Sequence, residues 1–183
     1  RHPPVAAGGE GHRPHLGAVG DAVSLELLLE ETAQERLQGY RSAYEKENLP
    51  VRESLIYHGD YTIQGGVRGI EKLVADNPDM TAVFVTNYEM TMGAVIGMNE
   101  LDLKIPEQLS MIGFDNLQFA RACNPKLTIV AQPTPGIARK VAGIMLKRLE
   151  EAESEETEPI TEKLGAEIIM GKSVRVLKEK ENS

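Results

Sequence analysis

Two apolar segments that each end in polar residues, with a helical segment between them, constrain this chain more than any other feature. Residues 81–86 are rich in β-branched side chains and precede Asn87, and residues 109–114 precede Asp115 and Asn116. Strands joined by a helix form a parallel unit, so both strands end at the same edge of the sheet. Small polar ligands bind at that edge in open parallel sheets. The pattern therefore favours binding over catalysis.

The alternation of strands and helices continues on both sides of this unit. Apolar residues at helical spacing predict helices within residues 34–47, 63–74, 89–101 and 134–149. Short strands are predicted at residues 54–57, 127–131, 166–170 and 173–177. The small residues of the third helix, including Gly93, are expected to let it approach the sheet closely. We therefore predict an α/β fold with a mostly parallel sheet flanked by helices.

Composition narrows the classes of protein that remain. A chain of 183 residues can bury one sizeable core, so one domain or one lobe of two is expected. The net charge of -8 has the wrong sign for a chain that binds nucleic acid by itself. A single cysteine, Cys123, excludes an internal disulfide, and no apolar run reaches the roughly 20 residues of a membrane helix. No secretion signal is seen. We expect a cytoplasmic protein that does not enter the membrane.

Four short motifs follow one another in the middle of the chain. They are Asn87-Tyr88-Glu89-Met90-Thr91-Met92-Gly93, Leu103-Lys104-Ile105-Pro106-Glu107, Gly113-Phe114-Asp115 and Pro125-Lys126-Leu127-Thr128. This series resembles the effector-binding core of the LacI/GalR family of bacterial transcriptional regulators, and the resemblance extends from about residue 35 to the carboxyl end. It implies a periplasmic-binding-protein-like type I lobe that is incomplete, and it implies an effector that is a sugar or a related small molecule.

The resemblance also implies a domain organisation. Residues 25–183 would be the effector-binding domain, mainly its carboxyl-terminal lobe, with part of the amino-terminal lobe near residues 127–148. Residues 1–24 mix Gly, Pro, Ala and His without a period, so they are left unassigned as loop or disorder. A shifted reading frame or a truncated gene would explain that segment. No helix-turn-helix pattern is visible, and we expect DNA to be bound only through a headpiece that this chain lacks.

Two ligand-binding candidates stand at the strand ends. The carboxylate of Asp115 can accept hydrogen bonds from adjacent hydroxyls, as sugar recognition requires, and the matching family residue contacts the effector. Asp115 could instead stabilise a turn. Asn87 offers both an acceptor and donors to a hydroxyl, but it could equally be a helix cap. Tyr88 departs from the family, which usually has Asp at that position.

Two further candidates lie at or near the start of predicted helices. The planar guanidinium of Arg36 can bind paired hydroxyls, a carboxylate or a phosphate, and its family counterpart points into the cleft. A surface ion pair is the alternative. Tyr61 matches a position where family members often place an aromatic ring beside the effector, although a core or dimer-face role fits it as well.

The resemblance places subunit contacts of a homodimer near Met92, Ala122 and Cys123. These side chains are small or flexible and suit a packed interface. An ordinary core position is the alternative for Met92, and nothing nearby marks Cys123 as a nucleophile.

Other functions find less support in the residues. No phosphate-binding loop, dinucleotide fingerprint, zinc-binding helix motif or nucleophile elbow is present, so we expect no cofactor, no metal and no enzyme activity. A periplasmic-type sugar-binding protein is the main alternative, but it would need an export signal. A small α/β enzyme using Asp60, Glu89 and Asp115 as acid or base is the weaker alternative. A product without regulatory activity is a further one.

Overall fold

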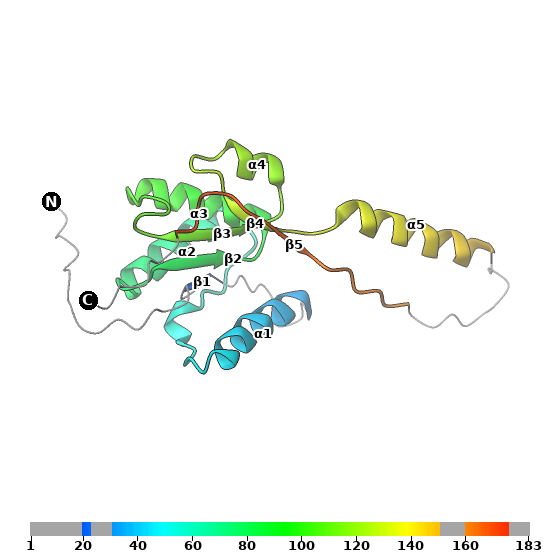
Figure 1. Ribbon diagram of the computed structural model, residues 1–183, viewed down its shortest axis with the longest axis horizontal. Helices are drawn as coiled ribbons and strands as arrows, with labels where there is room; N and C mark the ends of the chain where they lie inside the picture. Colours follow the sequence, from blue (N-terminus) through cyan, green and yellow to red (C-terminus); the bar gives the residue numbers. More distant parts are fainter. Residues whose placement is uncertain (1–19, 23–30, 151–159, 176–183) are drawn as a thin grey trace, which may run out of the picture.

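The computed structural model describes residues 20–22, 31–150 and 160–175 of the chain, so most of the unassigned segment 1–24 lies outside the described residues (Figure 1). Helices and strands alternate along these residues. In chain order they are β1 Gly20–Ala22, α1 Glu31–Lys46, the 3-10 helix η1 Glu53–Leu55, α2 Ile63–Asp76, β2 Ala82–Val85, α3 Tyr88–Glu100, β3 Ser110–Phe114, α4 Leu117–Ala122, β4 Thr128–Ala131, α5 Thr134–Glu150 and β5 Glu167–Ile169.

The strands of the described residues form one sheet in the order β1-β2-β3-β4-β5. The first four strands are parallel, and β5 pairs antiparallel with β4. Val83 lies beside Met111 in the register of β2 and β3, and Gly113 lies beside Ile129 in that of β3 and β4. The predicted α/β class with a mostly parallel sheet is confirmed.

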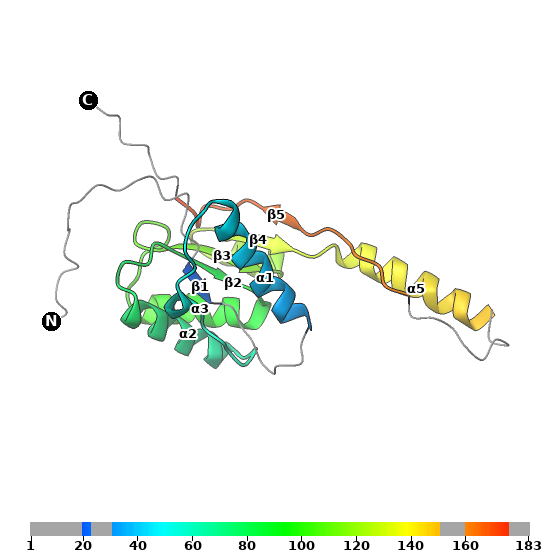
Figure 2. The ribbon, with the colours of Figure 1, turned by 90° about the horizontal axis from the view of Figure 1, so that it is seen from below.

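Helices α2 and α3 lie side by side against the sheet, and glycines set their distance (Figures 1 and 2). A Cβ on Gly66 would overlap the backbone of Met90, and one on Gly93 would overlap the backbone of Ile63. Gly93 therefore lets α3 approach α2, whereas we expected an approach to the sheet. The sheet contributes its own glycine, because a Cβ on Gly113 would overlap the side chain of Thr91.

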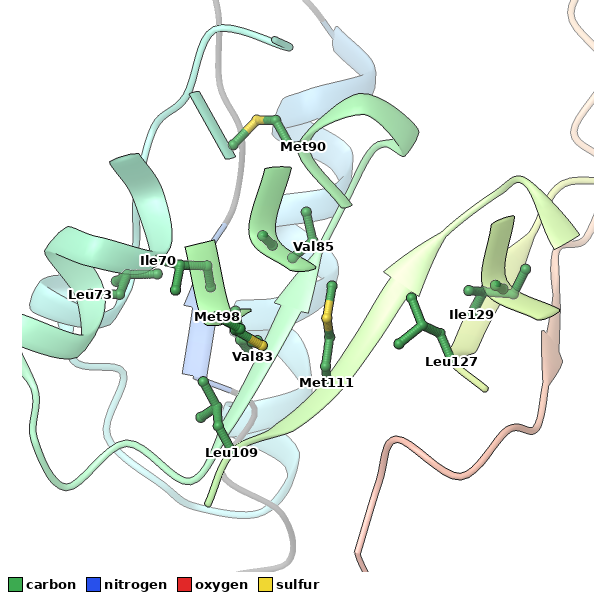
Figure 3. Packing of buried hydrophobic residues seen from close by; sticks show 12 residues of the cluster. Ile70, Leu73, Val83, Val85, Met90, Met98, Leu109, Met111, Leu127 and Ile129 are labelled. Atoms are coloured by element: carbon green, nitrogen blue, oxygen red, sulfur yellow. The ribbon is translucent and has the colours of Figure 1, made fainter. Parts of the chain in front are cut away.

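The core lies between these helices and the sheet (Figure 3). Its members are fully apolar side chains that alternate along the strands and recur along the helices, as the sequence pattern predicts. They include Ile70, Leu73, Val83, Val85, Met90, Met98, Leu109, Met111, Leu127 and Ile129. Helix α1 contacts the opposite face, because its Arg36 stacks on Phe114, which points away from the face on which Gly113 lies against Thr91 of α3.

Two segments predicted as strands take other conformations. Residues 54–57 begin within η1, where the Ser54 backbone oxygen accepts a bond from the Asn77 side chain. Residues 171–175 form no strand, and residues 176–177 lie outside the described residues. There Ser173 is fully buried, and its hydroxyl donates to the Met111 oxygen and accepts from the Thr128 N–H. Around Ser173 these side-chain bonds add to a backbone bond from the Met111 N–H to the Ser173 oxygen at 2.8 Å.

Helix α5 extends away from the sheet, and residues 160–166 return beside it (Figures 1 and 2). Lys140 of α5 forms an ion pair with Glu162 of the returning segment at 3.0 Å. Large apolar side chains of α5, including Val141, Met145 and Leu149, are exposed. Of the described helices, none has the length and apolar character to cross a membrane.

Candidate functional site

The carboxyl ends of β2 and β3 lie at one edge of the sheet, and Arg36 from α1 contacts the ends of both strands. Its Nη1 donates to the Thr86 oxygen at 2.7 Å, immediately before Asn87. Its guanidinium carbon lies 4.4 Å from the centre of the Phe114 ring, immediately before Asp115. The structure therefore brings Arg36 to the edge that carries Asn87 and Asp115.

Asn87 begins α3 as its N-cap. Its Oδ1 accepts from the Met90 N–H at 2.9 Å, and its backbone oxygen accepts from the Thr91 hydroxyl at 2.6 Å. The same hydroxyl accepts from the Phe114 N–H, so it ties α3 to β3. Within the described residues the buried Nδ2 of Asn87 has no hydrogen-bond partner. The cap thus uses the amide oxygen of Asn87 as an acceptor, and the Nδ2 donor remains available.

Asp115 adopts a left-handed backbone at the end of β3, with φ 54°, and Asn116 follows with φ 44°. The Oδ1 of Asp115 accepts from the backbone N–H of Gln132 at 3.0 Å, and its Oδ2 accepts from the Gln132 side-chain amide. Asn116 caps α4 by accepting from the Phe119 N–H. The turn at Asn116 is thus stabilised locally, whereas Asp115 binds a residue beyond the next strand.

Tyr61 precedes α2, whose first turn packs on the first turn of α3, and it also has a positive φ of 58°. The neighbouring Asp60 accepts from the backbone and hydroxyl of Thr62 and forms an ion pair with Arg68 at 2.6 Å. The bonds from Thr62, and then the charge of Arg68, hold the pKa of the Asp60 carboxyl below its usual value. Asp60 is an ionised carboxylate bound to the N-cap residue Thr62 and to Arg68 rather than a free acid.

An open groove of about 630 Å³ lies beside this edge, and it is lined by α1, the ends of β3 and β4, α5 and residues 160–166. Its polar lining includes Glu35, Arg36, Gln132 and Lys140, and its apolar lining includes Phe114 and side chains of α5. Arg36 is the predicted ligand residue that lines the groove directly, and Asp115 is linked to it through Gln132.

The residues predicted for subunit contact lie on α3 and at the end of α4. Met92 and Cys123 are half-buried, and Ala122 is exposed. The rings of Tyr88 and Phe119 meet edge to face with centroids 6.3 Å apart, and each stands one helical turn before Met92 or Cys123. Burial raises the pKa of the Cys123 thiol, which disfavours the reactive thiolate.

Gln132 is the site residue that the sequence analysis did not select. It is the first polar residue after β4, so the strand-end argument used for Asn87 and Asp115 would have found it. In the part of the chain that the structure describes, no three acidic, histidine or cysteine side chains gather as a metal site.

This arrangement is that of an open α/β binding lobe, with polar groups of several strand ends at one edge. Comparison with known proteins agrees. Residues 22–174 match the family model of the periplasmic binding protein-like domain. Catabolite control protein A of Priestia megaterium is 37% identical over 112 residues, which are 61% of this chain and 34% of that protein. The HTH-type transcriptional repressor PurR of Yersinia pestis is 34% identical over 139 residues, 76% of this chain and 39% of that protein.

A solved structure shares the fold. It is a sugar-binding transcriptional regulator of the LacI family from Escherichia coli, complexed with phosphate, with 26% identity and a TM-score of 0.71. The match covers 85% of this chain and 54% of that one. The chain belongs to the periplasmic binding protein-like domain family, in the form that LacI/GalR regulators carry as their effector-binding domain. It spans between a third and two fifths of the curated relatives named above.

Proposed function

We propose that this chain is the effector-binding and dimerisation portion of a LacI/GalR-type transcriptional regulator and that its effector is a sugar or a related polyhydroxyl compound. The observation that carries the proposal is the meeting of Arg36 with both strand ends, which gathers Asn87 and Asp115 at one edge beside an open groove. Residues 25–183 are assigned to this domain, mainly its carboxyl-terminal lobe, with part of the amino-terminal lobe near residues 127–148.

The chemistry of these groups suits hydroxyl ligands. The Asp115 carboxylate accepts hydrogen bonds, the left-over Asn87 amide donates one, and the Arg36 guanidinium has donors beyond the one bound to Thr86. Tyr61 supplies an aromatic ring for the apolar face of a sugar. Strained backbone at Tyr61 and Asp115 supports the assignment, because such strain clusters at binding sites.

The partners follow from the same family membership. We propose a homodimer through the surface around Met92, Ala122 and Cys123, where the Tyr88 and Phe119 rings form an apolar centre. DNA would be bound by a separate headpiece, in the cytoplasm, since this chain carries a net charge of -8. The proposal assigns the chain no catalytic step, because Asp60 is committed to Thr62 and Arg68.

The test is a titration of the 15N-labelled chain with D-glucose, D-ribose and cellobiose. Changes in the amide chemical shifts are measured by NMR during the titration, and they detect binding even at millimolar affinity. We expect shifts at Asn87, Asp115 and the first turn of α3. Asp115→Ala should abolish these shifts, whereas Asp102→Ala, at an exposed turn after α3, should preserve them. If none of the three saccharides changes the amide chemical shifts of the wild-type chain, the sugar assignment is refuted.

A further inference from the structure

Gln132 contacts Asp115 with both of its donor groups. Its backbone N–H donates to Oδ1 at 3.0 Å, and its side-chain amide donates to Oδ2. The two residues are separated by 17 positions, so the pairing is a tertiary contact between the end of β3 and the end of β4. Both oxygens of the carboxylate are therefore held in defined positions.

The contact extends the sheet beyond its last backbone pairing. The Asp115 N–H donates to the Val130 oxygen at 2.8 Å, and then the chain turns away at two successive left-handed residues. The N–H of Gln132, one residue past β4, is left without a backbone acceptor on β3, and the Asp115 side chain takes that place. The strained backbone of Asp115 is thus stabilised by hydrogen bonds from Gln132, which lies outside the turn at residues 115 and 116.

The pairing leaves capacity on the carboxylate. Two carboxylate oxygens offer about four acceptor positions, and Gln132 occupies two of them. About two remain for other donors. Gln132 itself lines the groove beside Arg36 and begins the crossover to α5, with its backbone oxygen accepting from the Thr134 N–H at 2.8 Å.

We propose that Gln132 is a positioning residue for the ligand, because it orients the Asp115 carboxylate and leaves the free acceptor positions of that group for ligand hydroxyls. The inference rests on the proposed function, since it takes a saccharide as the ligand of Asp115. Gln132 acts through Asp115 and need not touch the saccharide.

The experiment compares Gln132→Ala, Asp115→Asn and the double variant Asp115→Asn/Gln132→Ala in the same shift titration with the best-binding saccharide of the panel. Gln132→Ala is expected to raise the dissociation constant about fivefold, which corresponds to about 1 kcal/mol. In the Asp115→Asn background, Gln132→Ala should change the dissociation constant by less than about twofold, because the carboxylate that Gln132 orients is already gone. A change of that size is on the order of the additivity error.

Gln108→Ala is the matched control. Gln108 also uses an exposed side chain in one hydrogen bond, accepting from the Lys104 N–H at 2.8 Å, but it precedes β3 and so lies at the other edge of the sheet. It should leave the dissociation constant unchanged.

A polarity swap separates orientation from ligand contact. In Asp115→Asn/Gln132→Glu, the amide and the carboxylate exchange places, so the pair can form again with donor and acceptor reversed. We expect the urea midpoint of unfolding to recover relative to Asp115→Asn, while saccharide affinity stays low because the charge is now at position 132.

Three results would overturn the inference. A Gln132→Ala variant with altered stability and unchanged affinity would make Gln132 merely structural. An equal loss of affinity in both backgrounds would make it a direct ligand contact. An unchanged chemical shift of the Gln132 side-chain amide in Asp115→Asn would show that the two residues are not hydrogen-bonded. If no saccharide binds but this chemical shift does change, the proposed function fails while the pairing of the two residues stands.

Discussion

Arg36 is the residue that makes a binding edge out of two separate strand ends. Its side chain is half-buried, donates to the Thr86 oxygen and stacks on the Phe114 ring. Planarity is essential to this geometry, because one guanidinium group can bond in its plane and stack through its face. Arg36 therefore orders the site as well as offering donors to a ligand.

Arg36→Lys is expected to lower the free energy of unfolding by about 1 kcal/mol, because lysine keeps the charge but loses the stacking face. Urea denaturation followed by circular dichroism measures the change. Arg41→Lys is the control: Arg41 forms an exposed two-bond ion pair with Glu53, and its replacement should cost no more than about 0.5 kcal/mol. Equal effects of the two substitutions would contradict the role of stacking.

At the scale of the elements, the packing of α2 against α3 depends on glycine. The two helices contact each other more extensively than any other pair of elements described, and Gly66, Gly93 and Gly97 each face the backbone of the opposite helix. Small residues allow the first turns of both helices to reach the same edge of the sheet. Their close packing thereby joins the starts of the two helices, which follow Tyr61 and Asn87 in the chain.

Gly93→Ala should destabilise the chain by about 3 kcal/mol, because the added methyl group meets the backbone of Ile63 and Gly66, which cannot move like a flexible side chain. Gly39→Ala in α1 is the matched change. A Cβ there has no neighbour within 4 Å, so alanine should stabilise by roughly 0.5 kcal/mol through helix propensity. Thermal unfolding of both variants tests the contrast, and a harmless Gly93→Ala would mean that the helices are not so close.

For the molecule as a whole, several carboxylates are tied to cations or capping groups on the surface. Hydrogen bonds from Arg41 lower the pKa of Glu53, bonds from Thr62 lower that of Asp60, and bonds from Arg52 lower that of Asp79. A carboxyl group that binds its proton less readily when folded stabilises the fold above its ordinary pKa and loses this contribution as the pH falls through the lowered value.

The urea midpoint should accordingly be steady near neutral pH and fall as the pH drops below roughly 4, the ordinary range for these groups. Asp79→Asn removes one of these carboxylates and should make the fall of the urea midpoint at acid pH, the acid limb, less steep. Arg52→Gln, which removes its partner, should do the same. An acid limb that is unchanged in both variants would show that this pair does not contribute.

Assembly is the second property of the whole molecule. If the surface around Met92, Ala122 and Cys123 joins two copies, Ala122→Arg should raise the dimer dissociation constant at least about tenfold. Sedimentation equilibrium measures it. Ala75→Arg adds the same charge at an exposed position of α2 and should leave the association intact. A monomeric wild-type chain would instead remove the dimer from the proposal.

The sequence by itself determined the alternation of strands and helices and the polar residues at the strand ends, because apolar periodicity and local capping are encoded over a few neighbouring positions. It predicted the sheet, and it marked Arg36, Asn87 and Asp115 from their places in motifs. It did not reveal η1 or α4, whose short lengths carry little periodicity.

Only the tertiary structure decided which distant groups meet. The pairing of Gln132 with Asp115, the stacking of Arg36 on Phe114 and the approach of α2 to α3 at Gly93 each join segments far apart in the chain. Such contacts depend on how whole elements pack, and no local pattern records the distance between two surfaces. The residue types were visible in the sequence, but their partners were set by the fold.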